Sequence, residues 1–314
     1  MQPRPGITLI EVLVSIFIMG IGMIALLTLF PLGAVNVAQA LRDDRAAQAA
    51  ANADAFALAK NLRHDAAISS EFTQALEEVD PAYRSIGPGS PIYVDPYGIQ
   101  AGSGRLGAFT APLTPGIRRV SPTYVDNTPL PDDGSTAALR TTYWFSLLDD
   151  LNFDPAGTAT KDGSNAVERG GRYNWAYLLR RARADSKDVV EAFVVVYSSR
   201  PSSSASDETT LTATGKVGQN ALTIDYAAQN QPKPRVRVGS WFLDTTQDAT
   251  GVVRGYFYRV VDVQEIANTS MVLEVLNPLK VGLNVDPATA PTTFAVVLME
   301  NVVEVFDRGT GWRP

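Results

Sequence analysis

The chain lacks cysteine altogether and has one histidine, His64, among its 314 residues. The absence of cysteine excludes disulfides, thiolate zinc sites and thiol nucleophiles. No G-x-S-x-G segment accompanies the histidine, so His64 is predicted to be a surface or packing residue rather than a catalytic one. With a net charge of −6 and no basic cluster with interleaved aromatic residues, the chain is not expected to bind nucleic acid. These absences favour a structural protein over an enzyme.

What the sequence does have is one long apolar run near its start. The run extends from Ile7 to Val35, carries a single charge at Glu11, and follows a six-residue leader that ends in Gly6. A helix of about 29 residues is about 43 Å long, more than the roughly 30 Å of a hydrocarbon core. A carboxylate in such a helix is costly unless it has a partner or a function. We therefore predict a transmembrane and assembly helix over residues 7–35 in which Glu11 has a function.

The segment G-I-T-L-I-E-V-L-V at residues 6–14 resembles the prepilin motif of type IV pilins and type II secretion pseudopilins. The continuation at residues 15–27 is most similar to PilV-type minor pilins and minor pseudopilins. The resemblance implies that prepilin peptidase cuts between Gly6 and Ile7, removes residues 1–6 as a leader peptide, and methylates the new N-terminus.

The same resemblance implies a location and a set of partners. The chain would cross the inner membrane once, with its N-terminus in the cytoplasm and its C-terminal domain in the periplasm or in an extracellular filament. Its partners would be prepilin peptidase, other pilin or pseudopilin subunits, and the assembly platform of the inner membrane. The expected function is that of a minor pilin or minor pseudopilin, assembled into or priming a type IV pilus or a type II secretion pseudopilus.

The motif also has a physical interpretation. Cleavage before Ile7 would create a free ammonium group four residues from Glu11. In a medium of low dielectric constant, the ammonium group of one subunit attracts Glu11 of a neighbour by a few kcal/mol, which would fix the stagger between packed helices. We therefore expect Glu11→Ala to insert normally into the membrane but to enter filaments poorly.

Two other interpretations of this segment stay open. Ala38-Gln39-Ala40 has the small-x-small form of a signal peptidase site, although a secretory apolar region is only about 7–15 residues long and uncharged. The run also fits a generic signal anchor. The chain would then be a membrane-anchored extracytoplasmic binding protein or enzyme with a fortuitous motif.

Residues 36–64 continue the predicted helix to about His64, because they are rich in alanine and contain neither glycine nor proline. Pro31 and Gly33 interrupt it, so a kink or a melted turn is expected there. A weak apolar stripe is available for packing on the helix's own domain or on neighbouring helices. Its expected members are Val37, Leu41, Ala51, Ala55, Leu58 and Leu62.

Residues 65–140 are dense in turn formers and are predicted to be a loop-rich variable region, with short strands at Pro91–Val94 and Arg118–Tyr124. Residues 141–314 are predicted to be a β-rich C-terminal globular domain with a polar loop near residues 201–234. Its expected strands are Arg172–Arg181 paired with Val189–Tyr197, then Arg235–Leu243, Gly255–Ile266, Met271–Leu276 and Thr293–Phe306, with a weaker signal at Ala221–Tyr226.

The predicted fold class is therefore α+β and pilin-like. The outer half of a long N-terminal helix packs on a mainly antiparallel β-sheet domain with long loops. The sheet can divide into two parts near residues 201–234.

One candidate metal site lies in this domain. Asp150, Asn152 and Asp154 copy the first half of an EF-type calcium loop, and oxygen ligands at alternate positions suit calcium. Pro155 stands where such a loop needs glycine, however, and Lys161 occupies the position of the bidentate glutamate. Some pseudopilins bind calcium beside the sheet, so calcium stays open, but a solvated turn is the favoured interpretation. No other cofactor is expected.

Overall fold

The computed structural model describes most of the chain, which divides into two units, residues 1–45 and residues 46–314. The described residues are 9–74, 91–100, 104–109, 114–127, 141, 143–161, 170–181, 189–200, 208–247, 252–266, 268–280 and 291–310. The predicted cleavage site between Gly6 and Ile7 lies outside these residues.

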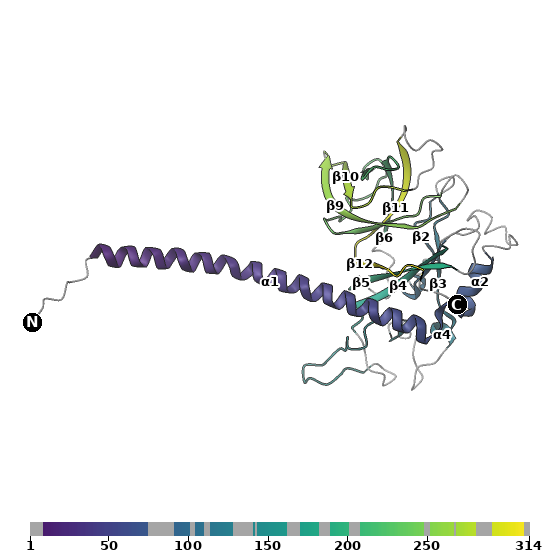
Figure 1. Ribbon diagram of the computed structural model, residues 1–314, viewed down its shortest axis with the longest axis horizontal. Coiled ribbons are helices and arrows are strands. Elements are labelled where there is room, and N and C mark those ends of the chain that lie inside the picture. The colour runs from purple at the N-terminus through teal and green to yellow at the C-terminus, as the bar shows by residue number, and fades with distance from the viewer. Residues whose placement is uncertain are drawn as a thin grey trace, which may run out of the picture. The chain divides into compact units, whose positions relative to one another are not determined.

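The long predicted helix is present as α1, Leu9–Ala59 (Figure 1). Helical structure continues through Pro31 and Gly33, so the expectation of a melted turn is wrong, whereas a kink there stays a prediction. The helix also ends earlier than expected. Asn61 has a left-handed backbone with a φ of 46°, and the chain passes into a short 3₁₀ helix, η1, Leu62–His64.

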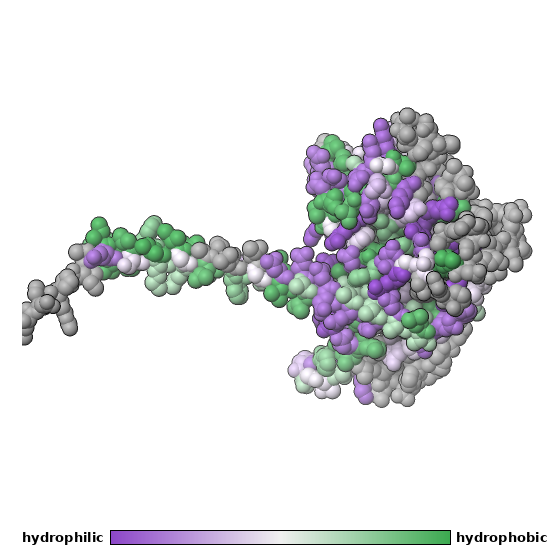
Figure 2. All heavy atoms as spheres, in the orientation of Figure 1, coloured by the Kyte–Doolittle hydropathy of each residue, from purple (hydrophilic) through white to green (hydrophobic). Residues whose placement is uncertain are grey.

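Between Leu9 and Val35, within the first unit, α1 presents apolar side chains on all sides. Consecutive residues such as Ile16, Phe17 and Ile18 are each more than 60% exposed, and successive residues of a helix point in different directions. Apolar atoms accordingly cover most of this part of the helix in Figure 2. The polar face expected of a helix that packs on one globular domain is missing from this stretch.

Within the second unit, the end of α1 packs on a sheet mainly through alanine, with Phe56 in addition against Trp175. The fully buried residues lie on one face of the helix and are Ala46, Ala49, Ala50, Ala53 and Ala57. The predicted stripe packs on this unit at Leu62, which is buried, but not at Ala51, Ala55 and Leu58, which are exposed; packing of these residues on neighbouring helices stays a prediction. Alanine lets the helix backbone approach the sheet closely enough for the Tyr177 hydroxyl to donate to the Ala53 carbonyl oxygen at 2.7 Å.

The first sheet has six strands in the order β12-β5-β4-β1-β3-β2 and is antiparallel except for the parallel pair β1 and β3. The strands are β1 Ile92–Val94, β2 Arg105–Leu106, β3 Ile117–Val120, β4 Tyr173–Arg181, β5 Val190–Ser198 and β12 Val302–Asp307. The predicted pairing of β4 with β5 is confirmed.

The region predicted as loop-rich, residues 65–140, contributes more regular structure than expected. It supplies β1, β2 and β3, with β1 inside the sheet between β4 and β3. It also forms three short helices, α2 Ala66–Gln74, α3 Pro96–Gln100 and α4 Thr123–Asn127. The strands are only two to four residues long, too short to show a clear alternation of apolar and polar residues.

Six further strands form a closed antiparallel barrel in the order β10-β7-β6-β11-β8-β9. They are β6 Glu208–Gly215, β7 Ala221–Asp225, β8 Trp241–Asp244, β9 Tyr256–Ile266, β10 Ser270–Val275 and β11 Thr292–Met299. The predicted polar loop near residues 201–234 is thus wrong for β6, whereas β7 confirms the weaker strand signal at Ala221–Tyr226. In β6, Leu211 and Ala213 point into the barrel core while threonines occupy the intervening positions.

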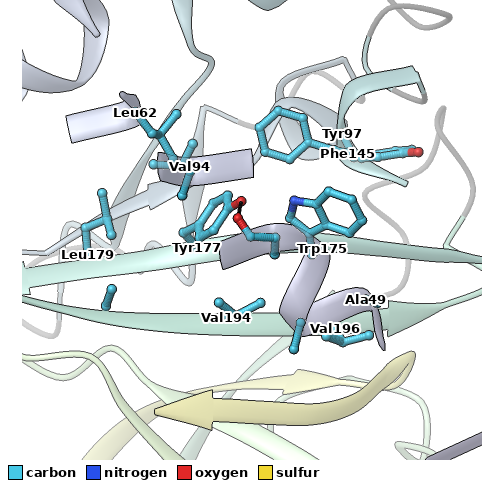
Figure 3. Packing of buried hydrophobic residues seen from close by; sticks show 14 of the residues in the cluster. Ala49, Leu62, Val94, Tyr97, Phe145, Trp175, Tyr177, Leu179, Val194 and Val196 are labelled. Atoms are coloured by element: carbon cyan, nitrogen blue, oxygen red, sulfur yellow. Dashed lines mark hydrogen bonds between the residues drawn. The ribbon is translucent and has the colours of Figure 1, made fainter. Parts of the chain in front are cut away.

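The sheet is the middle layer of the second unit (Figure 1). One face carries Trp175, Tyr177 and Leu179 of β4, which pack with the alanines of α1 and with the short helices (Figure 3). The opposite face carries Ala176 and Leu178, which belong to a second apolar cluster shared with the barrel. Because side chains alternate along β4, one strand serves both layers.

The barrel is inserted into the sheet domain between β5 and β12. The chain leaves the sheet after Ser198 and returns at Asn301, and the Ser198 amide donates to the Asn301 carbonyl oxygen at 2.8 Å. Entry and exit therefore lie side by side, as expected for one domain inserted into another.

Candidate functional site

Glu11 lies in the first turn of α1, where the partial positive charge of the helix N-terminus favours a carboxylate. Its backbone carbonyl oxygen accepts a hydrogen bond from the Ser15 hydroxyl at 2.7 Å. Large, exposed apolar side chains surround it in sequence, including Ile10 and Leu13. An acidic group in an otherwise apolar helical surface is the geometry that the sequence predicted for Glu11, while its role in assembly stays a prediction.

Across the part of the chain that the structure describes, no helix combines the length and the apolarity taken to define a membrane-crossing segment.

The three calcium candidates act as partners of backbone groups. The Asp154 carboxylate accepts from the Ala156 and Thr158 amides at 2.9 and 2.8 Å, closing a turn. The Asp150 carboxylate accepts a hydrogen bond from the backbone amide of Arg172. The backbone carbonyl oxygen of Asn152 accepts one from the backbone amide of Thr160 at 2.8 Å. Within the described residues, no group of three His, Cys, Asp or Glu side chains could hold a metal. Calcium binding stays a prediction.

His64 is exposed at the end of η1, and its Nδ1 lies 2.7 Å from the side-chain oxygen of Asn61. Its position agrees with the prediction of a surface residue.

The structure brings together four charged residues that the sequence did not single out. Asp95 follows β1, Arg119 lies in β3, Arg200 follows β5, and Glu208 begins β6. Arg200 bonds both oxygens of Asp95, and Arg119 Nε donates to Asp95 Oδ2 at 3.0 Å. Glu208 accepts from Arg200 at 3.0 Å and from Arg119. All four side chains are almost completely buried, so we call them the ionic cluster.

The charges of the ionic cluster balance, and each strengthens the others. Burial alone would raise the pKa of Asp95, but Arg200 and Arg119 outweigh it and hold that pKa below its ordinary value. Burial alone would lower the pKa of Arg200, but Asp95 and Glu208 raise it well above its ordinary value. Asp95, Arg119 and Arg200 therefore stay charged near neutral pH, and removing one of them would leave an uncompensated buried charge.

The ionic cluster joins the two parts of the second unit. Asp95, Arg119 and Arg200 belong to the sheet, whereas Glu208 is the first residue of the barrel. A sequence pattern could not reveal it, because Asp95 and Glu208 are more than a hundred positions apart in the chain. We regard the cluster as a structural joint, since its polar groups are satisfied by one another.

Comparison with known proteins identifies one segment of the chain. Residues 1–27 match the family model described as the prokaryotic N-terminal methylation motif. No curated protein and no solved structure matches the chain. The match covers Gly6, Ile7 and Glu11, and it supports a type IV pilin-like or pseudopilin protein. The amino-terminal segment of this chain thus carries the prepilin N-terminal methylation motif.

Proposed function

We propose that this chain is a minor pilin or minor pseudopilin, a structural subunit that is processed after Gly6 and assembled into, or used to prime, a type IV pilus or a type II secretion pseudopilus. The observation that carries the proposal is the methylation motif at residues 1–27, which leads directly into the long helix α1. Prepilin peptidase and other pilin or pseudopilin subunits are the partners that this motif implies.

The apolar surface of α1 supports anchoring of the N-terminal segment in the inner membrane. A helix with apolar side chains on all sides is stable in contact with lipid or with other apolar helices rather than with water. Glu11 is costly in lipid, and the ammonium group of a processed neighbour would lower that cost. Assembly is therefore favoured over a solitary anchored subunit.

The second unit supports the same proposal through its layers. An alanine-faced helix end lies flat on a mainly antiparallel sheet, which is the α+β arrangement expected from the resemblance. The barrel adds bulk on the other face of that sheet. Such bulk suits a subunit present in few copies, because a large domain is hard to repeat along a thin fibre.

The first experiment expresses the full chain with and without a prepilin peptidase and determines the N-terminus by intact-mass and peptide mass spectrometry. We expect a product that begins at N-methylated Ile7 only when the peptidase is present, and Gly6→Ala should abolish it. A chain left whole by the peptidase, or cut after Ala40, would overturn the proposal.

The second experiment measures assembly with Glu11→Ala and with Ser15→Ala as a matched control one turn further along the same helix. Both variants should reach the membrane in wild-type amounts. Only Glu11→Ala should be depleted from sheared filaments, as measured by quantitative immunoblot. Equal incorporation of the two variants would remove the assembly role of Glu11.

A further inference from the structure

A second buried aspartate, Asp244, has surroundings opposite to those of Asp95. It is the last residue of β8 and is 2% exposed. Its Oδ1 accepts from the Thr246 amide at 2.9 Å and from the Thr246 hydroxyl at 2.5 Å. Its Oδ2 is buried and has no hydrogen-bond partner among the residues that the structure describes. One half of this carboxyl group is therefore well satisfied and the other half is not.

Among the residues that the structure describes, the nearby charged groups do not pair with Asp244. Its neighbours in the ladder are Val296 of β11 and Tyr256 of β9, and Tyr258 is the other titratable group of β9 that senses its charge. Lys280 donates its backbone amide to the Tyr258 hydroxyl at 2.9 Å, while its Nζ and the guanidinium group of Arg180 lie over the ring of Tyr256. No arginine or lysine forms an ion pair with Asp244 in the described part of the chain. Burial raises the pKa of Asp244 to about 7.

The residues that follow Asp244 hold the barrel together. The Thr246 hydroxyl, which donates to Asp244, accepts from the Ala295 amide of β11 at 2.8 Å. The Thr245 amide donates to the Ala295 carbonyl oxygen, also at 2.8 Å. The Thr245 hydroxyl also lies 3.2 Å from the Ala295 carbonyl oxygen, so Asp244 orients one of three hydrogen bonds that join the end of β8 to β11.

The same residues fasten the barrel to the sheet. The Thr245 hydroxyl donates to the Gly107 carbonyl oxygen at 3.1 Å, and the Thr114 hydroxyl donates to the Thr245 carbonyl oxygen at 2.6 Å. Gly107 and Thr114 belong to the connection between β2 and β3. We call residues 244–246 and these partners the threonine joint.

We propose that Asp244 is a proton-controlled latch for the threonine joint. The protonated carboxyl group leaves no charge in the barrel wall, and the joint stays closed. Loss of the proton leaves a negative charge on a buried carboxylate whose Oδ2 accepts no hydrogen bond from the described residues. An uncompensated charge of this kind is costly in a buried site. Opening the joint to water relieves that cost, so a rise in pH from about 4 toward about 7 loosens the barrel at β8 and β11.

The sign follows from the two protonation equilibria. The closed joint binds the proton more tightly than an open, hydrated one, so a rise in pH favours opening. If the open joint gives Asp244 an ordinary carboxyl pKa, the opening equilibrium increases about 100-fold between about pH 5 and about pH 9.

Hydrogen–deuterium exchange of the full chain in detergent micelles tests the latch. After correction for the intrinsic pH dependence of exchange, peptides covering β8 and β11 should lose about 100-fold protection over this pH range. Peptides covering β4 and β5 serve as the internal reference and should not change. Asp244→Asn, which cannot ionise, should abolish the pH dependence. A wild-type joint without pH dependence, or the same dependence in Asp244→Asn, would overturn the proposal.

A second variant keeps the test decisive if Asp244→Asn fails to fold. Thr246→Val removes the hydroxyl that donates to Asp244 and therefore disfavours the ionised carboxyl group. It should loosen the joint at every pH but move the midpoint of the transition to higher pH. Asp95→Glu, in the ionic cluster, is the control that should leave this midpoint in place. A midpoint unaffected by Thr246→Val would show that another group titrates.

Discussion

Arg200 donates two parallel hydrogen bonds to Asp95, from Nη1 to Oδ1 at 2.7 Å and from Nη2 to Oδ2 at 2.8 Å. This bidentate arrangement is the strongest common geometry for an arginine–carboxylate pair. Arg200 also reaches Glu208 across the boundary between sheet and barrel. A single guanidinium group therefore contributes both to the folding of the sheet and to the attachment of the barrel.

Arg200→Met should destabilise the second unit by about 3–5 kcal/mol, because Asp95 and Glu208 would then share one buried arginine. Denaturant unfolding of the full chain in detergent, followed by tryptophan fluorescence, measures this loss. Lys233→Gln is the control, since Lys233 pairs with Glu265 at the exposed surface and its loss should leave the midpoint unchanged. An Arg200→Met midpoint equal to wild type would mean that the ionic cluster adds no stability.

Acid should weaken the same joint. Since the pKa of Asp95 is lowered in the folded protein, its contribution is complete above the unfolded value of about 3.9 and is lost as pH falls through the folded value. The denaturant concentration at the unfolding midpoint should therefore decrease as the pH is lowered below about 4. This decrease with pH should be less steep in Arg200→Met than in the wild type. Denaturant titrations of both proteins at decreasing pH measure the two slopes. Equal slopes would contradict the conclusion that Arg200 lowers the pKa of Asp95.

Gly98→Ala should cost about 1–3 kcal/mol by overpacking. Gly98 lies in α3, and a methyl group there would overlap Arg119 Nε and Asp95 Oδ2. Gly104→Ala is the matched control, because no atom lies within 4 Å of its added methyl group. Thermal unfolding of the two variants side by side should show a loss for Gly98→Ala only. Equal midpoints would indicate that the ionic cluster can shift to admit the methyl group.

Ala53→Leu should destabilise the contact between α1 and the sheet by about 1–3 kcal/mol, because Ala53 is fully buried where the Tyr177 hydroxyl meets the helix backbone. Ala55→Leu makes the same change on the exposed side of the same helix and should stay within about 0.5 kcal/mol of wild type. Denaturant unfolding of both variants provides the comparison. A larger effect at Ala55 would mean that the face assigned as buried is wrong.

The elements with strong local signals could be predicted from the sequence. Alanine and apolar residues predicted the long helix, and runs of valine and aromatic residues predicted β4, β5, β9 and β10 close to their observed bounds. The helix end was misplaced because the left-handed turn at Asn61 has no composition signal. The stripe was misassigned because the packing face is alanine, which hydrophobic periodicity barely registers.

The parts that depend on distant contacts could not be predicted. β6 alternates threonine with leucine and alanine, so its polar residues suggested a loop until the barrel supplied partners on both sides. The ionic cluster and the threonine joint each unite segments far apart in the chain, and no spacing rule connects them. The motif around Glu11 is different, because its meaning lies in a short local sequence that the family model also matches.

The adjacency of Ser198 and Asn301 has an evolutionary consequence. When a chain leaves and re-enters a sheet at one point, the inserted domain can be replaced by another without changing the path of the chain through the sheet. The attachment would need the apolar contact with the sheet, formed by residues such as Leu243 and Val297, the charge at position 208, and the hydrogen bonds of Thr245. Substitutions elsewhere on the barrel surface would leave this attachment to the sheet in place.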